Sequence, residues 1–145
     1  MSELSLRQAN ELIDEVLRAA RARAMPPLAV AVLDSGAHLK AFQRQDGVSF
    51  LRSQIAQAKA WGALAMACNT DQLAERYQQG EIQQGFINAL NAMTDGKIIP
   101  LPGGVLVHNA RNEVIAAVGA AGGLSEDDEA CVCSAIETLG FRLSK

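Results

Sequence analysis

The chain has 145 residues, of which 49% are hydrophobic and 20% are charged, a balance typical of one folded domain and not of a disordered segment. Its net charge of −3 argues against a nucleic-acid-binding protein, which usually presents a basic face. No apolar run approaches the length of a membrane span, and no secretory leader opens the sequence. We therefore expect a single cytoplasmic domain over residues 1–145, with no membrane contact.

The first predicted elements are a helix and a β-hairpin. Ser5 and Gln8 have the spacing of a capping box, and apolar residues then recur at helical intervals until two consecutive prolines end the pattern. Residues 28–34 form a short apolar run, which predicts a buried strand. A turn at residues 35–37 leads into residues 38–44, which we expect to return as the second strand.

Three helices are expected in the middle of the chain. They cover residues 49–67, a short segment from Asn69 or Thr70 to Tyr77, and residues 81–93. One side of the first helix is made mostly of small residues, which suit close packing against a sheet or another subunit: Leu51, Ile55, Ala58, Gly62 and Ala65. One side of the third helix is apolar, with Ile82, Phe86, Leu90 and Met93.

A second hairpin and a last helix are expected in the final third. Residues 97–99 suggest a brief edge strand, and residues 105–108 and 113–118 suggest the two strands of the hairpin. The glycine-rich residues 119–123 then predict a turn. Ser125 is the expected cap of the last helix, with Asp128 at the capping-box position and Gly140 at the end.

The order of these elements predicts the fold class. Two hairpins separated by helices, with four or five strands in all, indicate an α+β domain with a mainly antiparallel sheet and helices on its faces. A doubly wound parallel sheet would need single strands alternating with helices, and that pattern is absent from the sequence.

Charged residues and glycine turns mark the candidate site. Arg44 and Asp46 end the second predicted strand, and Lys59 lies on a helix of mostly small residues, which raises the chance of a charged network. The Pro-Gly-Gly turn at residues 102–104 either lets a ligand approach backbone amides or makes a bulge. The carboxylates of residues 126–129 would repel a phosphate, so they either cap their helix only or face a ligand through Asp128 or Glu129.

The histidines and cysteines give weaker signals. His38 and His108 are the only histidines, and each is either an ordinary surface residue or an axial ligand or general base. Cys131 and Cys133 project in different directions from a helix and cannot grip one metal ion. With Cys68 they make an odd number, so we expect reduced, buried thiols and no metal site.

The chain resembles the GlcG/HbpS family of small haem-binding or haem-degrading proteins, which also occur fused to a corrinoid adenosyltransferase. The resemblance covers nearly the whole chain in order, through residues 32–39, 44–47, 56–60, 101–105, 117–122 and 127–131. It implies a profilin-like, three-layer α/β/α fold with a five-stranded, mainly antiparallel sheet. It also implies a homo-oligomer of four or eight copies, a haem or corrinoid ligand, and a link to glycolate or diol utilisation.

These expectations combine into a tetrapyrrole-binding accessory role. Arg44 and Lys59 would pair with propionates, and His38 would be the axial donor. The alternatives are an enzyme that uses Lys59 and Glu129 as acid and base on a hydroxy acid or diol-derived metabolite, and a structural oligomer with no ligand. Besides His38, the ligand-binding residues are expected to line one cavity: Arg44, Asp46, Lys59, Pro102, Gly103, Gly104, Asp128 and Glu129.

Overall fold

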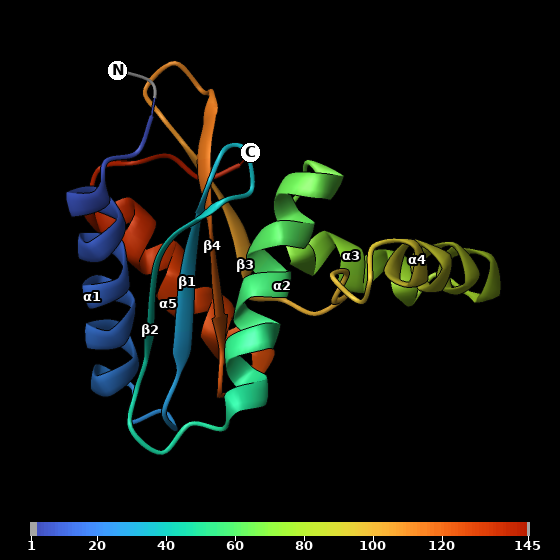
Figure 1. Ribbon diagram of the computed structural model, residues 1–145, viewed down its shortest axis with the longest axis horizontal. Helices are drawn as coiled ribbons and strands as arrows, with labels where there is room; N and C mark the ends of the chain where they lie inside the picture. Colours follow the sequence, from blue (N-terminus) through green and yellow to red (C-terminus); the bar gives the residue numbers. More distant parts are fainter. Residues whose placement is uncertain (1–2, 145) are drawn as a thin grey trace.

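The computed structural model describes residues 3–144 and contains a four-stranded antiparallel sheet with helices on both faces (Figure 1). The order of the strands across the sheet is β2-β1-β4-β3. None of the helices in the described residues is long and apolar enough to cross a membrane. The elements in chain order are α1 (Leu6–Ala22), β1 (Ala29–Asp34), β2 (Leu39–Arg44), α2 (Phe50–Met66), α3 (Thr70–Tyr77), α4 (Glu81–Met93), β3 (Gly104–His108), β4 (Val114–Ala121) and α5 (Ser125–Thr138).

The sheet separates two cores of different composition. Helices α1 and α5 cover one face, where large aliphatic side chains such as Ile13 and Val16 of α1 pack against Val30 and Val32 of β1. Helix α2 covers the other face, where the contacts are mostly alanine against alanine. Because alanine and glycine keep the two layers close, α2 lies much nearer its face of the sheet than large side chains would allow.

Several local predictions are confirmed. The capping box of α1 is present, since the N–H of Gln8 donates to Ser5 Oγ at 3.1 Å and the N–H of Ser5 donates to Gln8 Oε1 at 2.9 Å. The three middle helices and both hairpins lie where the pattern placed them, to within one or two residues at most ends. Gly140, with φ of 84°, follows the last helix as expected.

The expected fifth strand is wrong, because residues 97–99 form a loop. Side chains take its place beside the edge strand β3: Asn69 Oδ1 accepts the N–H of Leu106 at 2.8 Å, and Thr70 Oγ1 accepts that of Gly104 at 2.9 Å. The N–H of Ile98 instead donates to the Asn91 side chain of α4 at 2.9 Å. The start of α3 therefore satisfies the edge that another strand would have paired.

Three finer predictions also need correction. β4 runs on through Gly119 to Ala121, so the glycine-rich stretch is partly strand and the turn begins only at Gly122. The cap of α5 is Leu124, one residue before the expected Ser125. The buried side of α2 is not the predicted stripe, of which Leu51 and Ala65 are exposed, but Ala56, Lys59, Ala60, Gly62 and Ala63.

Helices α3 and α4 form an arm that extends away from the sheet (Figure 1). A small core of its own holds it together, with Leu73 of α3, Ile87 of α4 and Ile98 of the following loop buried against one another. Trp61 and Met66 of α2 pack against this core and connect the arm to the body of the domain.

Candidate functional site

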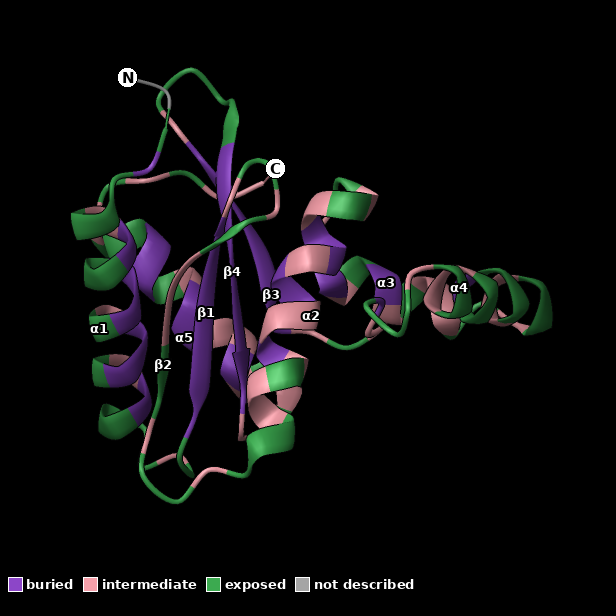
Figure 2. Cartoon of the chain, in the orientation of Figure 1, coloured by how far each residue is buried: buried purple, intermediate pink, exposed green. Residues whose placement is uncertain are grey.

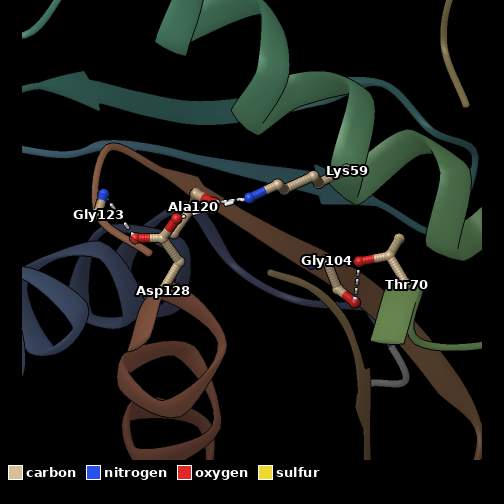
Figure 3. A network of polar contacts seen from close by, with 6 residues as sticks. All are labelled: Lys59, Thr70, Gly104, Ala120, Gly123 and Asp128. Carbon is tan, nitrogen blue, oxygen red and sulfur yellow. Dashed lines mark hydrogen bonds and ion pairs between the residues drawn. The ribbon is translucent and has the colours of Figure 1, made fainter. Parts of the chain in front are cut away.

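The buried ammonium group of Lys59 lies at the centre of a polar network between α2, β4 and α5 (Figure 3). Its Nζ donates to the carbonyl oxygen of Ala120 at 3.0 Å and lies 3.6 Å from Asp128 Oδ2. The second carboxylate oxygen of Asp128 accepts the N–H of Gly123 at 3.0 Å. A lysine and an aspartate from helices on opposite faces of the sheet thus meet where β4 ends.

Burial shapes the protonation of this ion pair. Removal from water lowers the pKa of Lys59, and the nearby Asp128 carboxylate opposes the shift. Burial likewise raises the pKa of Asp128, against the opposing effect of Lys59 and of the Gly123 N–H. Each partner depends on the other to remain charged, because an isolated buried charge is far more costly than a paired one.

The Pro-Gly-Gly turn contacts the same network. A Cβ on Gly103 would lie 2.8 Å from Lys59 Nζ, and a Cβ on Gly104 would overlap the backbone carbonyl of Lys59. These glycines therefore admit the lysine and its helix, and the space between them is already filled. Lys59, the Pro-Gly-Gly turn and Asp128 are brought together as predicted, and they are packed against one another.

Glu129, the neighbour of Asp128, has an unusual environment. Its Oε2 atom is buried and has no hydrogen-bond partner within residues 3–144. Burial, followed by repulsion from Asp71, Glu126 and Glu75, raises its pKa to about 7, although Lys59 acts in the opposite direction. The carboxyl group is thus partly protonated near neutral pH, as a general acid or base would need to be.

Arg44 and Asp46 do not join this network. Both line an open groove of about 470 Å³ beside Met25 and Pro27, at the end of α1. A neighbouring groove of about 440 Å³ shares Met25 and contains Arg23, Arg52 and the Gly122–Gly123 turn. The expected charged network of Arg44 and Asp46 with Lys59 is replaced by the pair that Lys59 makes with Asp128.

His38 lies towards the other end of the sheet. Asp34, which precedes its turn, pairs with Ala116, about four residues or roughly 13 Å along β4 from the Ala120 that holds Lys59. The His38 side chain is 81% exposed, and its Nδ1 lies 3.3 Å from Asp34 Oδ1. Burial raises the pKa of Asp34, but the backbone N–H groups of His38 and Gly36 outweigh it and leave that pKa below its usual value.

The groove next to the His38 turn was not expected from the sequence. It has a volume of about 440 Å³ and lies between the β1–β2 hairpin, α2 and the loop after α4. Trp61, the only tryptophan, lines it, and Lys97 Nζ stands 5.2 Å from the centre of that ring. A lone tryptophan on a helix of small residues was the one available signal, and it does not reveal which elements converge on it. The other apolar lining residues are Leu33, Ala37, Leu39 and Ala58.

The remaining candidates do not join this groove. His108 is 8% exposed, its Nδ1 has no hydrogen-bond partner in the described part of the chain, and its backbone pairs with Arg142. The three cysteines are free, as predicted, but only Cys131 is fully buried. Burial raises the pKa of each thiol, that of Cys133 to about 12, so none is an activated nucleophile. No group of His, Cys, Asp and Glu side chains in residues 3–144 has a metal-binding arrangement.

Comparison with known proteins places the chain among haem-associated relatives. The family model described as "Haem degrading protein HbpS-like" matches residues 4–137. No curated protein sequence matches. Among solved structures, a PduOC–haem complex aligns with a TM-score of 0.86 at 24% identity over 99% of both chains. The Klebsiella pneumoniae protein ORFY aligns with a TM-score of 0.84 at 26% identity, over 94% of this chain and 90% of its own. HbpS aligns with a TM-score of 0.79 at 25% identity, over 97% of this chain and 92% of its own.

Proposed function

We propose that this chain, which belongs to the HbpS-like family of haem-degrading proteins, is an accessory protein that binds a tetrapyrrole, with haem as its ligand. The observation that carries the proposal is the groove beside the His38 turn. Its lining includes the only tryptophan and a nearby lysine, and the groove adjoins the turn that carries His38, a histidine oriented by a carboxylate.

The chemistry of the groove fits haem. A porphyrin needs an apolar wall, which Leu33, Leu39 and Trp61 supply, and a cation near its propionates, which Lys97 supplies. A volume of about 440 Å³ is within the range of ligand pockets, and the open side leaves part of the ring in contact with solvent or another subunit.

His38 would hold the iron. It lies in sequence between Ala37 and Leu39, which both line the groove. Its Nδ1 is next to the Asp34 carboxylate, which would leave Nε2 as the nitrogen that holds the iron. A carboxylate behind a metal-binding imidazole fixes the tautomer and the ring orientation and raises the basicity of the ligand. Bound haem would supply an iron centre for ligand or redox chemistry.

The other residues named from the sequence take supporting parts in this proposal. Lys59, Gly103, Gly104 and Asp128 hold α2 and α5 on the sheet without touching the ligand. Arg44 and Asp46, in the separate groove beside Met25, offer an alternative place for the propionates. A corrinoid is the alternative ligand, since it shares the tetrapyrrole ring and accepts the same axial imidazole.

Support also comes from the relatives, since PduOC was solved in complex with haem.

The enzymatic alternative has less support, because the Lys59 side chain is 2% exposed and its ammonium is engaged by Ala120 and Asp128. The homo-oligomer of four or eight copies and the link to glycolate or diol utilisation stay predictions of the resemblance alone.

Titration with haemin tests the proposal. We expect wild-type protein to shift the Soret band at micromolar haemin, and His38→Ala to weaken binding at least about tenfold, as loss of one metal ligand should. Arg44→Ala is the matched control, with wild-type affinity. A flat wild-type titration would refute the tetrapyrrole role, and weaker binding by Arg44→Ala alone would move the ligand to the groove beside Met25. A parallel titration with a cobalamin distinguishes the two tetrapyrroles.

A further inference from the structure

The groove beside Trp61 is charged at one wall only. Among the side chains of the described residues that line it, those of Asp95 and Lys97 are charged and the others are neutral. Both belong to the loop that follows α4. Figure 2 shows the arm and this loop as mostly exposed, in contrast to the buried strands of the sheet. A charged group of a ligand in the groove therefore meets its ionic partner at this wall.

Lys97 is held at the groove without a carboxylate of its own. None of the ion pairs within residues 3–144 includes it. Its Nζ instead stands 5.2 Å from the centre of the Trp61 ring, within the range of a cation–π contact. At an exposed site such a contact is weaker than a charge-assisted hydrogen bond to a carboxylate. An incoming carboxylate can therefore draw the Lys97 ammonium away from the ring.

The Trp61 ring is held from two sides. It packs against the body cluster that contains Leu33 and Leu106, and it also packs against the small core of the arm. When Lys97 turns to a carboxylate, the ring face that it covered becomes available for stacking against a flat macrocycle. The same lysine thus links recognition of a charge to exposure of the aromatic face.

Asp95 limits the number of carboxylates that this wall accepts. It stands two residues before Lys97 in the same loop, and none of the ion pairs within residues 3–144 neutralises it. The turn that adjoins the groove carries a further carboxylate, that of Asp34. Like charges repel more strongly beside apolar walls than in bulk water. A ligand with two carboxylates therefore finds one cation and two anions, and only one of its carboxylates is compensated.

We infer that the groove selects a flat macrocycle that presents a single carboxylate to Lys97 and turns a second carboxylate out through the open side. The inference rests on the proposed function and adds which group of the ligand is recognised, and by which residues. Lys97 is the recognising cation, and Asp95 rejects a second anion beside it. The two propionates of haem lie on neighbouring pyrrole rings, so when one reaches Lys97 the other lies along the same edge, towards Asp95 or solvent.

Three zinc porphyrins with the same ring test this selection: protoporphyrin with both carboxylates free, its monomethyl ester and its dimethyl ester. Because Trp61 is the only tryptophan, quenching of its emission by the bound ring gives each dissociation constant. We expect the diacid and the monoester to bind within about twofold of each other, since one carboxylate is enough. The dimethyl ester should bind about fivefold more weakly, as loss of one solvent-accessible ion pair predicts.

Two variants of the loop reverse the selection in different ways. Lys97→Gln should remove the preference for a free carboxylate. Asp95→Lys, which supplies a second cation, should make the diacid bind about fivefold more tightly than the monoester. Arg7→Gln is the matched control, because it removes one positive charge from an exposed position on α1, on the opposite face of the sheet from α2. It should keep the wild-type order of affinities.

Far-UV circular dichroism checks that the variants remain folded. A wild-type protein that binds the monoester as weakly as the dimethyl ester overturns the inference, as does a preference for free carboxylates that survives Lys97→Gln. Both results leave the tetrapyrrole role intact. If none of the three porphyrins quenches Trp61 or changes its own absorption spectrum on mixing, the tetrapyrrole role itself fails and the inference fails with it.

Discussion

Lys59 Nζ lies 3.6 Å from Asp128 Oδ2, and this buried pair joins the two helical layers through the end of the sheet. The partners are far apart in the sequence and come from α2 and α5. Because both side chains are almost fully removed from water, the pair acts as a structural clamp whose two charges must be kept or lost together.

The buried ion pair predicts that mutations of Lys59 and Asp128 have strongly non-additive effects on the free energy of unfolding. Lys59→Met, which fills a similar volume, should lower the free energy of unfolding by about 3–5 kcal/mol, because it leaves the Asp128 charge buried and uncompensated. Adding Asp128→Asn should recover most of that loss, since the amide keeps an oxygen for the Gly123 N–H. Urea unfolding of the wild type, both single variants and the double variant measures the coupling. If the double variant lost as much unfolding free energy as the two single variants together, the account would be contradicted.

The close approach of α2 predicts a contrast between glycines. Gly104→Ala and Gly119→Ala should each destabilise the protein by about 1–3 kcal/mol or more, because the new Cβ would overlap the backbone of Lys59 or Ala56. Gly85→Ala, with open space around it, should leave stability unchanged or raise it by up to about 1 kcal/mol. Thermal and denaturant unfolding check both effects. Equal tolerance at all three positions would mean that α2 is not held close to the sheet.

Glu129 predicts a dependence of stability on pH. Its pKa in the folded protein is about 7, above the ordinary value of 4.5, so the folded state binds this proton more tightly than the unfolded chain. Its contribution to stability is therefore complete below pH 4.5 and is lost as the pH rises through about 7.

Glu129→Gln should flatten this part of the curve and be more stable than the wild type above neutrality. Denaturant unfolding across that pH range makes the comparison, with Glu137→Gln, an exposed carboxylate on the same helix, as the control. If the stability of Glu129→Gln changed with pH as steeply as that of the wild type, other groups would govern the pH dependence of stability.

Local signals predicted most of the fold. The capping box at Ser5, the turn at Gly36 and the glycine after α5 act within a few residues, so the sequence alone reveals them. The missing fifth strand was not predictable in this way. Its place at the edge of β3 is taken by the side chains of Asn69 and Thr70, which come from a helix far along the chain from the loop at Ile98.

The candidate site was harder to predict, for the same reason. Lys59, the Pro-Gly-Gly turn and Asp128 were correctly grouped, but the sequence does not reveal that they fill their own space. The groove around Trp61 is assembled from three separated segments, and none of them has a motif that points to the others. Tertiary packing decides which side chains are buried and which segments of the chain converge, and the spacing of residues in the sequence does not reveal it.

The location of the ligand is tested most directly by nuclear magnetic resonance with a diamagnetic porphyrin. Titration of ¹⁵N-labelled protein with zinc protoporphyrin should shift amide signals of the His38 turn, of α2 around Trp61 and of the loop at Lys97. The signals of Arg44, Gly122 and Gly123, in the grooves beside Met25, should stay in place. Shifts confined to those grooves, or no shifts at all, would contradict a tetrapyrrole site beside His38.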